Sequence, residues 1–271
     1  MDFLLSINIL LYMLSPSPTS WSTTLNVLFF YMTWSTLVLS HSPLFVHVYG
    51  VLAIRIVFFI IPSLLSLLFD ASLPSLAEKV KHGGRSALPP RDAKALSRLL
   101  GLVMLNLGVM TGVEGALSFV LLKILKGPVF RTSTALPLPW QMFKHVVILL
   151  AVRGGLQYYI HRSILHGERY SAAKKHRDFA HARSSPPFSL LLMADHPIPL
   201  MLHRLLPLFL PALLLRPHLL TYFLFTFICT MEETLAMSGY IVVPIMFMTG
   251  IAQRTAVHYA GEGRPTLAVG G

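Results

Sequence analysis

The chain has 271 residues, of which 54% are apolar and only 12% are charged. Soluble domains carry about 25% charged residues, so this chain has roughly half of the charge that a water-soluble fold uses to cover its surface. The same composition excludes a disordered chain, and the single cysteine, Cys229, excludes a disulfide scaffold. The composition therefore predicts an integral membrane protein.

Basic residues outnumber acidic ones by 22 to 11, which gives a formal net charge of +11 at pH 7. Nucleic-acid-binding proteins have such a charge, but none of their motifs accompanies it in this sequence. The basic residues instead gather between apolar segments, where they set the orientation of a membrane protein. We therefore expect a membrane, and no nucleic acid, as a partner.

The apolar segments set the expected number of membrane crossings. A spanning helix needs about 20 apolar residues, and both Phe3–Leu14 and Tyr240–Ile251 are too short. The expected spans are Trp21–Ser40, Phe45–Phe69, Leu99–Leu122, Phe143–Ile160, Leu200–Leu215 and Leu219–Met237. The fourth contains Arg153, and Pro207 and Pro211 interrupt the fifth, so we expect four to six crossings.

Two loops between these segments are strongly basic. Lys79–Arg98 and Arg162–Arg183 each carry six Lys or Arg residues. Two expected crossings separate the loops, so both face one side of the membrane, which the positive-inside rule predicts to be cytosolic. We divide the chain at the end of the first loop, into N-terminal spans with a basic loop (residues 1–98) and a histidine-bearing part (residues 99–271).

Histidines are concentrated in the second part of the chain, with eight of the twelve between His161 and His258. Neutral imidazole is the commonest side-chain ligand of transition metals. The pairs His161/His166 and His176/His181 are spaced by five residues, which places their side chains about 140° apart on an ideal helix. One site holds both members of a pair only if the helix tightens, bulges or ends there. The spacing thus gives some support to a metal site, and the density of histidines alone favours a metal site and a solvated basic loop about equally.

Five stretches of the sequence resemble one known family in their order along the chain. The stretches are Tyr158–His166, Lys175–Phe188, Asp195–Pro197, Glu232–Tyr240 and Gly250–His258. They resemble, respectively, the first histidine box, the second box, a His-Pro element, a Glu…Ser-Gly-Tyr element and the approach to the last box of the fatty acid hydroxylase/sterol desaturase superfamily. Members of that superfamily are membrane di-iron enzymes. The resemblance covers residues 141–263.

The resemblance implies a fold, a cofactor and a reaction. The fold would be all-α, a multi-span transmembrane helical bundle with a cytosolic histidine-bearing cap, in the endoplasmic reticulum. The protein would be an oxidoreductase, a hydroxylase or desaturase of lipid metabolism, using iron and O2 on a lipid or lipid-like substrate. No haem or dinucleotide motif occurs in the sequence, so electrons would come from a separate partner of the cytochrome b5 type. The metal ligands would be His161, His166, His176, His181, His196 and His258.

Carboxylates near a metal site orient its imidazole ligands. The candidates here are Asp178, Asp195, Glu232 and Glu233, and we assign catalytic roles to Asp195 and Glu233. His203 and His218 are candidates to complete the ligand set, but both lie within or beside apolar helices, where a core or interfacial role is favoured. Glu114 lies within an apolar segment, and we expect it to pair with Arg55 or Arg153 or to be protonated.

Departures from the family pattern keep a second function open. Ala173 and Arg177 stand where the second box has imidazoles, and Ala256 stands in the last box. These positions fit a family member that has lost catalysis and acts as a membrane scaffold. A zinc hydrolase would use the same histidines, but the sequence has no His-Glu-x-x-His motif.

Overall fold

The computed structural model describes residues 18–167, 169–181, 186–241 and 246–261, so the apolar segment Phe3–Leu14 lies outside it. Within the described residues the chain forms helices and no strand, and only two isolated β-bridges occur. The predicted all-α fold is confirmed. The main helices are α2 (Pro18–Ser40), α3 (Pro43–Arg55), α4 (Ile61–Ser72), α5 (Pro74–Val80), α6 (Ala93–Leu125), α7 (Pro139–Tyr159), α8 (Ser171–Phe179), α9 (Pro197–Leu200), α10 (Leu206–Leu215), α11 (Leu219–Met237) and α12 (Met246–Ala260).

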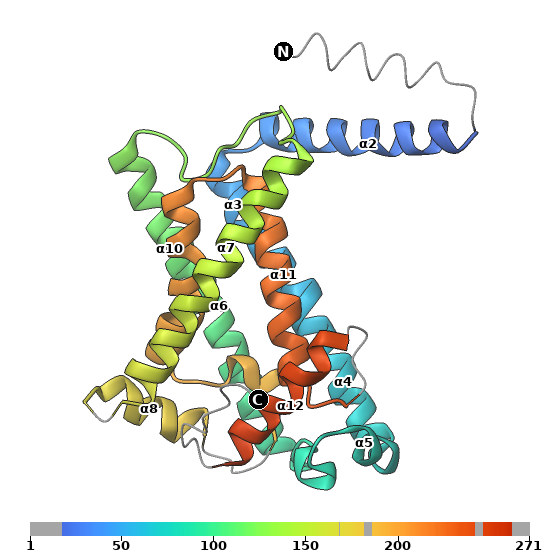
Figure 1. The fold of residues 1–271 in the computed structure, drawn as a ribbon, viewed down its shortest axis with the longest axis vertical. Helices are drawn as coiled ribbons and strands as arrows, with labels where there is room; N and C mark the ends of the chain where they lie inside the picture. The colour runs from blue at the N-terminus through green and yellow to red at the C-terminus, as the bar shows by residue number, and fades with distance from the viewer. Residues whose placement is uncertain (1–17, 168, 182–185, 242–245, 262–271) are drawn as a thin grey trace.

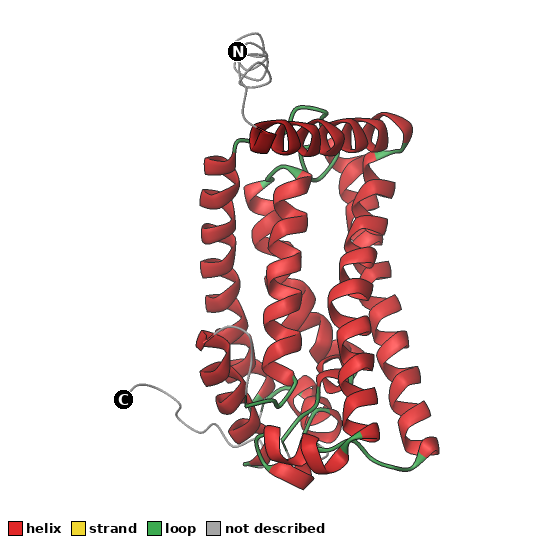
Figure 2. Cartoon of the chain, turned by 90° about the vertical axis from the view of Figure 1, so that its right-hand side faces the viewer, coloured by secondary structure: helices red, strands yellow, loops and turns green. Residues whose placement is uncertain are grey.

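Four continuous helices are long and apolar enough to cross a membrane. They are Pro43–Ser72, Ala93–Leu125, Pro197–Leu215 and Leu219–Met237. Figures 1 and 2 show the long helices running side by side along the long axis of the molecule. Helix α3 packs against both α6 and α11, so helices from before and after residue 98 share one bundle.

Two of the four spans contain a π-helical turn shortly before a proline. Segment η1 (Ile56–Ile60) precedes Pro62, and segment η5 (Met201–Leu205) precedes Pro207. Proline has no N–H, so the carbonyl four residues earlier loses its usual helical partner, and a wider turn accommodates the defect. The interruption expected at Pro207 is therefore a local π turn, and the helix continues through it to Leu215.

Helix α2 corresponds to the first expected span, Trp21–Ser40, and here the prediction was wrong. It forms a helix but lies crosswise over one end of the bundle in both views (Figures 1 and 2), and it is not among the four apolar spans. The indole Nε1 of Trp34 donates to the carbonyl oxygen of Ser133 at 2.8 Å. This long-range bond holds α2 against the loop that joins α6 to α7.

Helix α7 corresponds to the fourth expected span. It runs along the bundle and packs against α10 and α11 (Figure 1). It carries Lys144 and Arg153, and it is not among the four helices apolar enough to cross a membrane by composition.

A buried polar network surrounds Glu114 inside the bundle. Its Oε2 accepts from Arg55 Nη2 at 2.6 Å, and its Oε1 accepts from the Tyr222 hydroxyl at 2.6 Å and lies 3.1 Å from His47 Nε2. These side chains come from α3, α6 and α11 and are almost fully buried. Of the two arginines that the sequence offered as partners, Arg55 is therefore the one used.

Candidate metal centre

Six imidazoles converge at the end of the bundle opposite α2, where Figure 1 shows α8 and α12. Four segments far apart in the sequence supply them: the π turn η3 (Ile160–Leu165) with the residue after it, α8 with the residues after it, η5, and α12. The ring centroids of neighbouring imidazoles are 4.5–5.7 Å apart. The six residues are His161, His166, His176, His181, His203 and His258.

The π turn η3 explains how His161 and His166 share one site. The backbone N–H of His166 donates to the carbonyl oxygen of His161 at 3.0 Å, which is an i to i+5 bond. This wider turn rotates residues five apart onto the same face of the helix. The two Nε2 atoms consequently lie 3.1 Å apart, and His258 Nε2 lies 3.3 Å from His161 Nε2.

The potential ligand atoms form two groups of three. In each group, one nitrogen from every imidazole lies within 4.8 Å of the other two. The first group is His161, His166 and His176, and the second is His166, His181 and His258. Because His166 belongs to both groups, the two candidate positions are adjacent.

His176 is held in a defined orientation by Asp195. The His176 Nδ1–H donates to Asp195 Oδ2 at 2.6 Å, and Asp195 Oδ1 accepts from the backbone N–H of His196 at 2.6 Å. Asn106 Nδ2 donates to the carbonyl oxygens of Met193 and Asp195, each at 2.7 Å. A carboxylate behind an imidazole fixes the tautomer that leaves the other ring nitrogen, here Nε2, free to bind a metal.

Several imidazole nitrogens are buried without a hydrogen-bond partner among the described residues. They are His161 Nδ1, His176 Nε2 and both ring nitrogens of His181. A buried polar atom left without a partner costs about 1–3 kcal/mol, so native proteins rarely leave several together. A bound transition-metal ion would supply the partner of His176 Nε2 and of one ring nitrogen of His181. Imidazole nitrogen is a common ligand of iron and zinc. The residues present therefore fit a metal ion.

Burial keeps these imidazoles in the neutral form that binds metals. Desolvation, followed by the neighbouring His176 and His258 imidazoles, lowers the pKa of His181 to about 3. Desolvation and the adjacent imidazoles also hold the pKa of His161 well below its usual range. Both rings are neutral at pH 7 in the absence of a metal, so no proton has to leave when an ion binds.

The structure does not bring every predicted residue into the cluster. His196 lies apart, where its Nδ1 accepts from the Ile198 N–H at 3.2 Å and caps α9. His218 caps α11 at the opposite end of the bundle. His203, for which the sequence favoured a core role, lies 4.8 Å from His161 between ring centroids. Only one feature of the sequence indicates the position of His203 in the cluster. Pro207, four residues later, induces the π turn that contains His203.

Glu233, the second predicted catalytic carboxylate, belongs to an ion-pair network. It accepts from Arg153 at 2.5 Å and from Arg204 at 2.9 Å, and Glu232 accepts from Arg153 at 2.7 Å. Asp178 is exposed on α8. Of the four candidate carboxylates, Asp195 is therefore the one that touches a cluster imidazole among the described residues.

A cavity of about 670 Å³ connects the imidazoles with the ion-pair network. It lies among α7, η3, η5, α11 and α12. Its lining includes the imidazoles of His161, His166, His203 and His258 and the ion-pair residues Arg153, Arg204, Glu232 and Glu233. A small molecule in this cavity would therefore contact the candidate metal centre.

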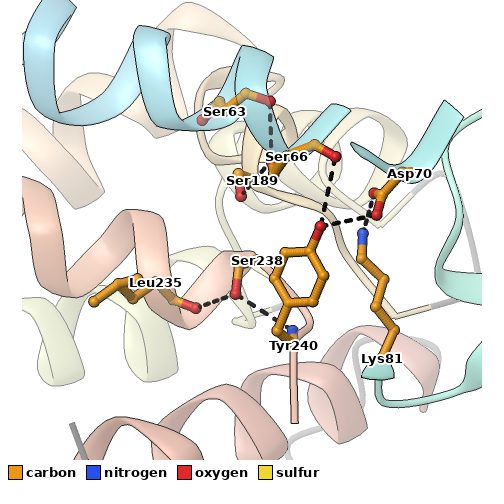
Figure 3. Close-up of polar contacts among 8 residues, drawn as sticks. All are labelled: Ser63, Ser66, Asp70, Lys81, Ser189, Leu235, Ser238 and Tyr240. Atoms are coloured by element: carbon orange, nitrogen blue, oxygen red, sulfur yellow. Dashed lines mark hydrogen bonds and ion pairs between the residues drawn. The ribbon is translucent and has the colours of Figure 1, made fainter. Parts of the chain in front are cut away.

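The Ser-Gly-Tyr element fixes the segment that leads to α12. Figure 3 shows the Tyr240 ring pointing toward Asp70 and Lys81, and its hydroxyl donates to Asp70 Oδ1 at 2.9 Å. Lys81 forms a buried ion pair with Asp70. Gly239 has a φ of +75°, and a Cβ there would lie 2.7 Å from the carbonyl oxygen of Pro187, so only glycine fits. This element ties the N-terminal helices to the segment preceding His258.

Neither family models nor solved structures assign this fold or cluster. No family model matches the chain. No solved structure matches it either. A proposal for the function therefore rests on the geometry of the histidine cluster together with the sequence resemblance.

Proposed function

We propose that this protein is a membrane-bound oxygenase that holds two iron ions in its histidine cluster and hydroxylates or desaturates a lipid. One observation carries the proposal: imidazoles from four separate segments converge, and His176 points a buried, unpartnered Nε2 into the cluster while Asp195 holds its Nδ1. A hydrophobic core without a ligand gains nothing from several buried imidazole nitrogens that lack hydrogen-bond partners.

Each part of the site has a distinct role in this proposal. The five histidines of the groups His161/His166/His176 and His166/His181/His258 would hold the iron ions, and His166, which belongs to both groups, would be a ligand of one ion, because each ring offers one ligand nitrogen. Iron supplies the activation of O2 that oxidation of an unactivated C–H bond requires. Asp195 keeps His176 in the ligand tautomer, and the network of Arg153 with Glu232 and Glu233 shapes the wall against which the substrate rests.

Charge supports the proposed side of the membrane, and the sequence resemblance supports the proposed electron donor. Basic side chains Lys174, Lys175 and Arg177 lie on α8, at the bundle end that carries the imidazoles. Basic residues gather on the cytosolic side of membrane proteins. We propose a cytosolic centre in the endoplasmic reticulum, with electrons supplied by an acidic donor of the cytochrome b5 type attracted to this surface.

A second candidate is a scaffold without catalytic activity. Ala173 is buried on α8 one turn before His176, and the Arg177 side chain is exposed. Neither residue has an imidazole, so two ligands that the second histidine box would supply are absent. This favours an incomplete set of metal ligands. Metal binding without turnover would support this alternative.

Product formation distinguishes the two candidates. We would place the iron-loaded full chain in nanodiscs with a lipid extract of its host membrane, add cytochrome b5, its reductase and NADH under 18O2, and analyse the lipids by mass spectrometry. We expect an 18O-containing or newly unsaturated lipid with the wild type and with His41→Ala, an exposed histidine outside the cluster. We expect none with His176→Ala. No product from an iron-loaded wild type would contradict the oxygenase and favour the scaffold.

A further inference from the structure

The cavity beside the imidazoles has an unbalanced charge. Four arginines and two glutamates line it. Glu232 and Glu233 neutralise Arg153 and Arg204 through ion pairs of 2.5–2.9 Å. Arg162 and Arg254 also line the cavity and enter no ion pair among the described residues. Among the residues that the structure describes, the cavity lining therefore has a surplus of two positive charges, and bound metal ions would increase it.

The two surplus arginines are free to reach a ligand. Both side chains are exposed, and the hydrogen bond that Arg162 makes to a side chain goes to the hydroxyl of Tyr158, not to a carboxylate. A guanidinium binds a carboxylate or a phosphate through paired N–H donors. Arg162 and Arg254 line the same cavity as His161, His166 and His258, so an anion that they bind would lie in the cavity that contains the candidate metal ligands.

One wall of the cavity leaves room for an apolar chain. Ala236 and Met237 of α11 line the cavity with Gly154 of α7, and a Cβ built on Gly154 would meet no atom within 4 Å. At Gly154 no side chain covers the backbone of α7, and this exposed position borders the cavity.

We propose that the cavity binds an amphiphile with an anionic head group, a carboxylate or a phosphate monoester, which Arg162 and Arg254 hold beside the imidazoles. The proposal rests on the proposed function because it names the substrate class of the same site. Binding of the head group itself needs no iron, so it can be tested in the metal-free protein.

The test measures binding of tritiated oleate to the iron-free full chain in dodecylmaltoside by scintillation proximity. We expect unlabelled dodecanoate or dodecyl phosphate to displace oleate at a concentration at least about tenfold lower than dodecanol does. The stronger of the two anions identifies the head group. Arg162→Gln and Arg254→Gln should each weaken oleate binding by about 10–100-fold, and Arg91→Gln, an exposed arginine outside the cavity, should leave it unchanged.

A blocking variant gives a second test that does not depend on charge. Gly154→Leu fills the cavity wall, while leucine favours the helix more than glycine does, so the variant should fold. Gly155→Leu is the matched control, because Gly155 has the same open surroundings but does not line the cavity. We expect only Gly154→Leu to reduce oleate binding, by at least about tenfold.

Three outcomes would overturn the anionic-head-group proposal: no saturable oleate binding, equal displacement by dodecanol, or unchanged binding in both arginine variants. If any of these outcomes occurs while the wild type still incorporates 18O into a lipid, amphiphiles with an anionic head group are excluded as substrates and the oxygenase proposal is unaffected. Charge-dependent oleate binding by a protein that takes up no iron would support the binding site and contradict the oxygenase.

Discussion

Replacing Glu114 with glutamine should destabilise the folded bundle by about 3–5 kcal/mol, because the change leaves Arg55 charged and buried without its counter-ion. The two side chains are each 2% exposed, so water cannot take the place of the carboxylate. The free energy of unfolding can be measured in bicelles by titration with sodium dodecyl sulfate. Glu78→Gln, at an exposed position, should change it little.

A paired substitution tests whether charge is the cause. Replacing both Glu114 and Arg55 with methionine removes the unpaired charge together with its partner, and we expect most of the stability to return. A Glu114→Gln variant as stable as Glu78→Gln would show that the network does not hold α3, α6 and α11 together.

Replacing Asp195 with alanine should weaken metal binding by about 10–100-fold, because His176 loses the acceptor that fixes its tautomer and ring orientation. Affinity for Fe(II) can be measured by competition with a coloured chelator under anaerobic conditions. Asp195→Asn retains a carbonyl oxygen that can accept from His176, so we expect a smaller loss. Asp178→Ala, at an exposed position on the same side of the bundle, should bind as the wild type does. Equal affinity in Asp195→Ala and Asp178→Ala would remove Asp195 from the site.

The all-α bundle could be predicted because apolar length is a local property of the sequence. Four expected segments coincide closely with the four apolar helices of the structure. The crosswise position of α2 could not be predicted in the same way, because it depends on a bond between Trp34 and Ser133, 99 residues apart. The composition of a segment shows that its helix is apolar, but it does not show whether that helix runs along the bundle or across its end.

The histidine cluster was only partly predictable for a similar reason. Five of the predicted residues come together, but the five-residue spacing of His161 and His166 is ambiguous until the π turn is known. His203 was assigned to a core because its neighbours are apolar. The proline at position 207 signals the π turn of η5, yet nothing local shows that this turn faces His161. His196 matched a family element in sequence but serves as a helix cap.

The central claim is that the converging imidazoles form a metal centre, and the iron content of the purified full chain tests it most directly. Elemental analysis after anaerobic reconstitution should give about two iron ions per chain in the wild type and in His196→Ala, and a loss of both in His161→Ala/His176→Ala. His196→Ala separates the geometry of the cluster from the sequence resemblance, which assigns that residue as a ligand. A folded wild type that takes up no iron, or a double variant that retains it, would contradict the account.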